Sequence, residues 1–219
     1  RDVVPTEYPL YRGCEGNGFT FGGYAKATYN IMRMLGMQEK LRVPVQITYG
    51  GSARIRNRVG AVVTRDQSGE RVVVLVWYYI APDSLRNAAG LRYEDLRAYG
   101  NENLRGNVEI VLDGLGPGTR HVEGYVVDET RSNGFHYRQA IADAKAPADE
   151  ANTWLADNNP FAASVALERV ESRDAVRTEA GRLSLRYEGV APWTAMLIEV
   201  RSEGRATVRG EWPRPATAD

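Results

Sequence analysis

The feature that most constrains the fold is a change in hydrophobic period near residue 43. Before it, apolar or small side chains recur three and four residues apart, at Tyr24, Ala27, Thr28, Ile31, Met34 and Leu35. That spacing is typical of one face of a helix, which we expect over residues 24–36. After residue 43, apolar residues alternate in short runs separated by turns that contain glycine. The sequence therefore predicts one amphipathic helix followed by a mainly β domain.

The β part is predicted to be an antiparallel β-sandwich. The expected strands are 43–49, 59–65, 71–79, 107–112, 120–128, 182–187, 194–201 and 206–210. Strands 59–65 and 71–79 flank the turn sequence Asp66-Gln67-Ser68-Gly69, which is typical of a hairpin. Crossover helices, which a parallel sheet needs, are mostly missing. Two insertions, 83–103 and 148–156, interrupt the pattern, and each is predicted to contain a short helix.

The helix predicts a packing partner. One apolar face implies contact with a large surface, and few residues before Val43 could supply it. We expect that face to be half of an interface whose other half lies outside this chain, so that Met34→Asp weakens docking more than it unfolds the sandwich. The chain begins at Arg1 with no initiator methionine, no leader-like segment and no apolar run long enough to cross a bilayer. These features predict a part of a larger protein.

Composition excludes several classes of function. The formal charge is zero, with 28 basic and 28 acidic residues, so no nucleic-acid partner is predicted. Cys14 is the sole cysteine, and His121 and His136 are the only histidines. Such a set does not favour a zinc centre or a Ser-His-Asp site. There is also no glycine-rich phosphate loop. We expect no metal, no cofactor and no membrane partner.

Four motifs occur in a characteristic order. They are a helix ending in Met34-Leu35-Gly36, a strand reading Val73-Val74-Leu75-Val76-Trp77-Tyr78-Tyr79, the stretch Asp128-Glu129-Thr130-Arg131-Ser132-Asn133, and Leu197-Ile198-Glu199-Val200. This series resembles the C-terminal part of glycoside hydrolase family 39, the family of retaining β-xylosidases and α-L-iduronidases. The resemblance runs from about Asp2 to Val200. It departs at Arg131, where the family usually has His, and at 83–103, which is longer than its counterpart.

The resemblance implies two regions. Residues 1–42 would form the end of a (β/α)8 catalytic barrel, a loop plus the last helix, and residues 43–219 a C-terminal β-sandwich domain packed on that barrel. Family members cleave glycosides with two glutamates on barrel strands. Both would lie upstream of Arg1, so no catalytic residue is assigned here. The implied partner is a carbohydrate substrate held by the barrel; the sugar, the compartment and association between copies are left open.

Glu7 is the candidate substrate-binding residue. The resemblance implies a place in the loop after the eighth barrel strand, where a carboxylate would accept hydrogen bonds from sugar hydroxyls. The alternatives are a nucleophile, because Thr-Glu-aromatic also occurs around that residue in the family, and a solvated loop position. The competing interpretation of the whole chain is a non-catalytic carbohydrate-binding or structural β-sandwich module.

Other residues carry a functional and a structural interpretation each. Trp77, Tyr78 and Tyr79 could stack on pyranose rings, but we favour alternation between the core and an edge. Asp128, Glu129, Ser132 and Asn133 could bind calcium or substrate; hydrogen bonds to the nearby backbone at a strand exit are favoured. His136 is predicted to be a packed or solvent-edge imidazole and Cys14 an inert thiol.

Overall fold

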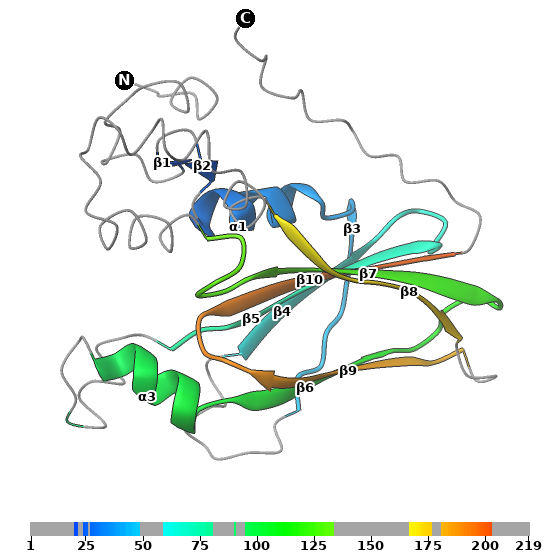
Figure 1. Ribbon diagram of the computed structural model, residues 1–219. Helices are drawn as coiled ribbons and strands as arrows, with labels where there is room; N and C mark the ends of the chain where they lie inside the picture. Colours follow the sequence, from blue (N-terminus) through cyan, green and yellow to red (C-terminus); the bar gives the residue numbers. More distant parts are fainter. Residues whose placement is uncertain are drawn as a thin grey trace, which may run out of the picture.

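The computed structural model describes residues 20–21, 24–25, 27–48, 59–80, 90, 95–133, 167–176 and 181–202. In chain order, its elements are β1 (Thr20–Phe21), β2 (Tyr24–Ala25), α1 (Ala27–Gly36), β3 (Leu41–Val43), β4 (Val59–Arg65), β5 (Arg71–Tyr78), α3 (Leu96–Asn103), β6 (Gly106–Leu112), β7 (Thr119–Val127), β8 (Glu168–Val176), β9 (Leu183–Val190) and β10 (Thr194–Ser202). Figure 1 shows a larger sheet with α1 over one face and the pair β6–β9 against the other.

The predicted antiparallel β-sandwich is confirmed. The larger sheet has six strands in the order β3-β4-β5-β10-β7-β8, and the smaller sheet pairs β6 with β9. Every pair of neighbouring strands in the two sheets is antiparallel. β4 and β5 form the predicted hairpin, in which Gly69 takes a φ of 73° and the Asp66 carboxylate accepts the backbone N–H of Arg71. β10 is the last strand described, and it pairs with β5 on one side and β7 on the other.

The main hydrophobic core lies between the two sheets. Alternate residues of the central strands, such as Val74, Val122 and Ile198, share one buried cluster with Leu183 and Leu185 of β9. The alternation follows from the period of two along a strand, which sends the remaining apolar residues to the other face. The larger sheet therefore has two apolar faces, and each needs a cover.

The second face of the larger sheet is covered in part by α1. Met34 is 0% exposed and shares a cluster with Leu75 of β5 and Leu197 of β10. Ala27 and Ile31 pack against the same cluster. The expectation that this side of the helix has its partner outside the chain is therefore wrong, because the sheet itself is the partner.

A second row of α1 remains exposed. Met32 is 52% exposed and Leu35 is 45% exposed, and Thr28 on the same stripe is exposed as well. Positions four and seven residues apart lie on one side of a helix. The apolar stripe predicted from the sequence is therefore divided between an inner row, buried on the sheet, and an outer row, open to solvent.

Some expected elements differ from the structure. The helix begins at Ala27 instead of Tyr24, because Tyr24 pairs with Phe21 in a small hairpin. The strand expected at 43–49 is instead β3 at Leu41–Val43. It ends there because Pro44 has no N–H to donate to β4. The expected boundary between residues 42 and 43 falls within this strand. The expected helix in 83–103 is confirmed as α3, whereas 148–156 and 206–210 lie outside the described residues.

Candidate functional site

The stretch Asp128–Asn133 forms a tight turn directly after β7. One carboxylate oxygen of Asp128 accepts the backbone N–H groups of Thr130 at 2.9 Å and Arg131 at 2.8 Å, and the other accepts the Arg131 Nε–H at 2.8 Å. Burial alone would raise the pKa of Asp128, but the hydrogen bonds from Arg131 and Thr130 outweigh it and lower that pKa below its ordinary value. The turn's own groups thus use both oxygens, as the structural interpretation predicts.

The same turn fastens α1 to the sheet. Ser132 has a φ of 54°, and its hydroxyl donates to the backbone carbonyl of Val126 at 2.6 Å. Its own backbone carbonyl accepts a hydrogen bond of 2.7 Å from Nδ2 of Asn30, on the first turns of α1. Asn30 and Ser132 are both fully buried. Asn133 closes the turn by donating to the carbonyl of Asp128 at 3.0 Å.

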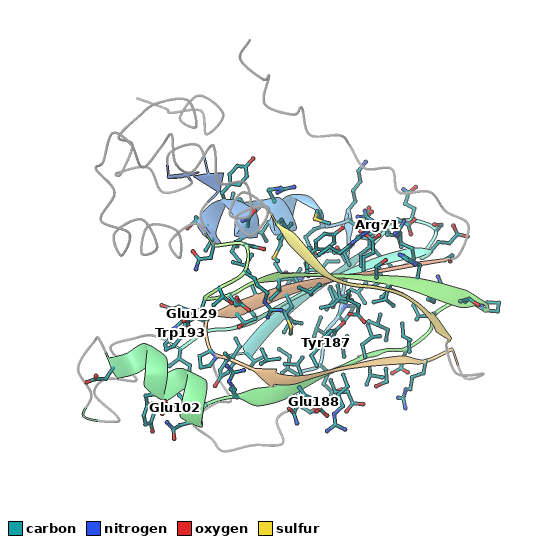
Figure 2. All side chains as sticks on the ribbon, in the orientation of Figure 1. Arg71, Glu102, Glu129, Tyr187, Glu188 and Trp193 are labelled. Carbon is teal, nitrogen blue, oxygen red and sulfur yellow. The ribbon has the colours of Figure 1, made fainter. Side chains whose placement is uncertain are left out.

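A cleft of about 650 Å³ lies between the two sheets. Its apolar lining includes Val126, Val190 and Met196. Gly124 also lines it, and a Cβ at this position would lie 3.0 Å from Cβ of Glu171, so the Glu171 side chain already fills the space that a larger residue at 124 would need. Tyr187 crosses from β9 to the larger sheet and donates its hydroxyl to Glu171 at 2.8 Å. Figure 2 shows Tyr187 in the space between the sheets.

Charged residues line the rim of this cleft, and their charges are paired with one another or with the backbone. Arg131 pairs with Asp128, Arg186 pairs with Glu188 at 3.2 Å, and Arg105 donates to the backbone carbonyl of Gly189 at 3.0 Å. Glu188 points away from the sandwich in Figure 2. Two of the carboxylates that line the cleft, Asp128 and Glu188, are thus already paired with arginines of the same rim.

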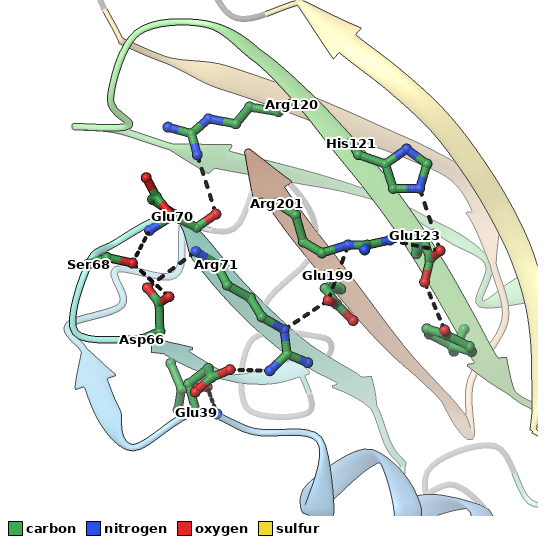
Figure 3. Close-up of polar contacts among 12 residues, drawn as sticks. Glu39, Asp66, Ser68, Glu70, Arg71, Arg120, His121, Glu123, Glu199 and Arg201 are labelled. Carbon is green, nitrogen blue, oxygen red and sulfur yellow. Dashed lines mark hydrogen bonds and ion pairs between the residues drawn. The ribbon is translucent and has the colours of Figure 1, made fainter. Parts of the chain in front are cut away.

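A ladder of charged residues crosses the α1 face at the end of the sheet opposite the Asp128–Asn133 turn. In Figure 3, Arg71 of β5 joins Glu39 to Glu199, and its Nε lies 2.8 Å from Oε1 of Glu199. Arg201 of β10 continues the ladder to Glu199 at 3.3 Å and to Glu123 of β7 at 2.9 Å. Glu199, Arg201 and Glu123 are buried. We call these five residues the charge ladder.

The ladder shifts the pKa of two of its members. Burial alone would lower the pKa of Arg71, but Glu199 and Glu39 outweigh it and raise that pKa above its ordinary value. Burial alone would raise the pKa of Glu123, but the Tyr125 hydroxyl, at 3.0 Å, and Arg201 outweigh it and lower that pKa. Arg71 and Glu123 are therefore both held in their ionised forms, which suits a structural network better than a proton-transfer site.

The aromatic residues of β5 separate as the alternation predicts. Tyr78 is buried and donates its hydroxyl to the carbonyl of Leu104 at 2.9 Å. Trp77 and Tyr79 are on the other side of the strand, and they are 37% and 53% exposed. Trp193 is a separate structural anchor whose indole N–H donates to the carbonyl of Ile80 at 2.7 Å.

The remaining candidates do not form a site in the described part of the chain. Glu7, Cys14 and His136 lie outside the described residues. His121 lies 3.5 Å from Glu123, at the end of the charge ladder. Across the described ranges, no three or more His, Cys, Asp and Glu residues are grouped to hold a metal ion. The described helices include none with the length and hydrophobicity needed to span a membrane.

The sequence analysis did not identify the structural roles of Asn30 and of the charge-ladder residues. Asn30 stands in the middle of an apolar helix stripe, which was its only signal. Arg71, Glu199 and Arg201 stand in strands at positions of the same parity as buried apolar residues, and charges there indicate mutual pairing.

This arrangement is a fold found in glycoside hydrolases. It is similar to the GH39 enzyme from Xanthomonas axonopodis pv. citri, with a TM-score of 0.55 and 12% identity over 83% of this chain and 31% of that one. It is also similar to a monomeric β-xylosidase from Caulobacter crescentus, with a TM-score of 0.55 and 14% identity over 83% of this chain and 32% of that one. The chain thus spans about a third of the length of these enzymes. The sequence matches no protein-family model and no curated protein.

Proposed function

We propose that this chain is the β-sandwich portion of a retaining glycoside hydrolase of β-xylosidase type, which supports a (β/α)8 catalytic barrel. The observation that carries the proposal is the likeness of its fold to two glycosidases that are about three times as long. Residues 1–40 would complete the barrel, and the sandwich would begin with β3 at Leu41, two residues before the boundary expected from the sequence. The two catalytic glutamates, one acting as acid and the other as nucleophile, would come from the barrel.

The outer row of α1 supports a barrel as the occupant of that surface. Met32 and Leu35 are about half exposed, while the inner row of the same helix is buried on the sheet. A helix whose apolar surface is wider than the part covered by the sheet is typical of a helix that also contacts a second packed body. In this proposal α1 is that layer, with the sandwich on one side and the neighbouring barrel helices on the other.

The test is the product of the complete coding region. We expect it to contain an upstream barrel and to hydrolyse aryl β-xylosides, releasing xylose that first appears as the β-anomer in proton NMR. The 219-residue chain alone should not hydrolyse them, and Glu7→Gln should change nothing in that chain. An upstream region without a barrel, or turnover by the chain alone that Glu7→Gln abolishes, would contradict the proposal.

A non-catalytic sandwich remains the second candidate. The observation that favours it is the burial of Met34 against the sheet, because α1 and the sandwich then share one closed core without a barrel. A double variant of the complete gene product, Met32→Asp with Leu35→Asp, separates the two candidates by its glycosidase activity and by the stability of its sandwich. Loss of activity with an unchanged sandwich favours the barrel; equal behaviour of variant and parent favours the independent module.

A further inference from the structure

We propose that Trp77 and Tyr79 form a stacking platform for a neutral pyranose oligosaccharide. The two side chains are on the α1 face of the larger sheet, and they are 37% and 53% exposed. The residues that alternate with them, Tyr78 and Ile80, are buried on the other side. Positions two apart on a strand lie about 7 Å from each other. One oligosaccharide could therefore contact both rings.

The residues that flank Trp77 make room for its ring to lie along the sheet. Its partners in the neighbouring strands are Gly60 on β4 and Ala195 on β10. A Cβ built on Gly60 would lie 2.2 Å from Cζ2 of Trp77, so the indole occupies the space that any other residue's side chain would need. The indole therefore lies over Gly60, and the side chain remains 37% exposed.

The described side chains beside Trp77 on this face of the sheet favour an uncharged sugar. Next to Gly60 and Ala195 on the same face are Val62 and Val127, and none of these four carries a charge. The charge ladder is at the other end of the strands, around Arg71. A pyranose with equatorial hydroxyls presents axial C–H groups to an aromatic face, whose electron density is negative. Xylose and glucose chains linked β-1,4 have this geometry.

The location of the platform connects it with the proposed function, on which this step rests. The first turns of α1 lie at the Trp77 end, because Asn30 bonds to Ser132 just after β7, and Val127 of β7 is in register with Ala195 and so with Trp77. The residues after α1 reach the other end, where Glu39 meets Arg71. In Figure 1, α1 begins beside the loop that follows β7 and leads at its other end into β3. In a (β/α)8 barrel, the loops before the helices carry the active site. The platform would thus be at the catalytic end and would receive sugar units beyond the bond that is cleaved.

The first experiment needs no barrel. The 219-residue chain is titrated with xylotetraose by isothermal calorimetry, and Trp77→Ala, Tyr79→Ala and Trp77→Phe are compared with it. We expect Trp77→Ala to weaken binding about tenfold or more, Tyr79→Ala to weaken it less, and Trp77→Phe to keep part of it. Leu35→Ala, an equally exposed apolar residue on α1, is the matched control and should bind as the parent does.

The same variants separate a sugar platform from a protein contact. A dimer in sedimentation experiments that Trp77→Ala dissociates, without any binding of xylotetraose, would assign the surface to a second copy and overturn the proposal. Binding that Trp77→Ala leaves unchanged would overturn it equally. Gly60→Ala is a further check, because its Cβ must displace the indole and should weaken binding while Trp77 is still present.

The second experiment uses the complete gene product. We expect Trp77→Ala to lower kcat/KM for xylotetraose about tenfold or more while kcat/KM for an aryl β-xyloside stays the same. If the parent hydrolyses neither substrate, the proposed function fails, and the binding titration alone judges the platform. If the parent is active and Trp77→Ala affects both substrates equally or neither, the platform at the catalytic end is wrong and the proposed function stands.

Discussion

Asn30 and Ser132, which are 102 residues apart in the chain, are joined by a buried hydrogen bond of 2.7 Å from the Asn30 amide to the Ser132 carbonyl. This bond connects the helix that covers the larger sheet to the turn that ends β7. The left-handed backbone of Ser132 and the hydrogen bond from its hydroxyl to the Val126 carbonyl fix the position of the Ser132 carbonyl. Several measurable properties of the chain depend on such connections between α1 and the sheet.

Replacing Asn30 by Ala should lower the free energy of unfolding by about 1–3 kcal/mol, because the buried carbonyl of Ser132 loses its donor. Urea unfolding followed by circular dichroism measures the change. Asn103→Ala is the matched control, since the Asn103 amide makes an exposed bond of 3.0 Å to Tyr99 within α3. That variant should change stability by about 0.5 kcal/mol or less. Equal losses in the two variants would contradict the proposed role of Asn30.

Substitutions in the inner row of α1 should lower the stability of the chain, whereas substitutions in the outer row should leave it nearly unchanged. Met34→Ala removes a fully buried side chain and should cost about 2–5 kcal/mol, whereas Met32→Ala should stay within about 0.5 kcal/mol. Met34→Asp should unfold the chain, which reverses the expectation from sequence that it would mainly weaken docking. Thermal melts of the three variants provide the comparison, and a stable Met34→Asp chain would refute the packing of α1 on the sheet.

Asp128 should make the chain sensitive to acid. Because folding lowers its pKa, the folded chain holds fewer protons than the unfolded chain at low pH. The stabilisation is complete above the ordinary pKa of aspartate, about 3.9, and is lost as the pH falls through the lowered value. Asp128→Asn should thus flatten the fall of stability between about pH 5 and pH 2. Asp113→Asn is the control: its exposed pair with Arg182 also lowers the pKa of Asp113, but water and salt screen that pair, so the slope should change less than in Asp128→Asn.

Removing one carboxylate from the charge ladder should be costly. Glu199→Ala leaves the buried guanidinium of Arg201 and the half-buried one of Arg71 without this partner, and we expect a loss of about 3–5 kcal/mol. Glu188→Ala removes one member of an exposed pair with Arg186 and should cost about 1 kcal/mol or less. Chemical unfolding compares the two. Similar losses would mean that burial of the ladder contributes nothing to its strength.

The parts of the fold that depend on local pattern could be predicted from the sequence. β4 was predicted with its observed bounds and β5 to within one residue, because alternating apolar residues and the turn before Gly69 specify a hairpin locally. β8 was missed, because an edge strand reading ERVESRDAV has too few apolar residues to show a period. Its pairing with β7 is a long-range contact that no local pattern reveals.

The partner of α1 could not be predicted for a related reason. The helical period identified the apolar stripe, but a stripe does not say which surface covers it. Only the sheet order shows that Leu75 and Leu197 come together on one face beneath Met34. The roles of Trp77 and Tyr79 were similarly open, since alternation separates them from Tyr78 but cannot decide which of the two sets faces solvent.

The central place of β10 has a consequence for synthesis of the protein. The strand bridges β5 and β7, so neither half of the larger sheet can be completed before residues 194–202 have been made. A nascent chain on the ribosome would carry the larger sheet as two separate parts with open edges until residues 194–202 emerge. Truncations that remove residues 194–202 should therefore be far more damaging than their length suggests, although most of the described core is encoded before them.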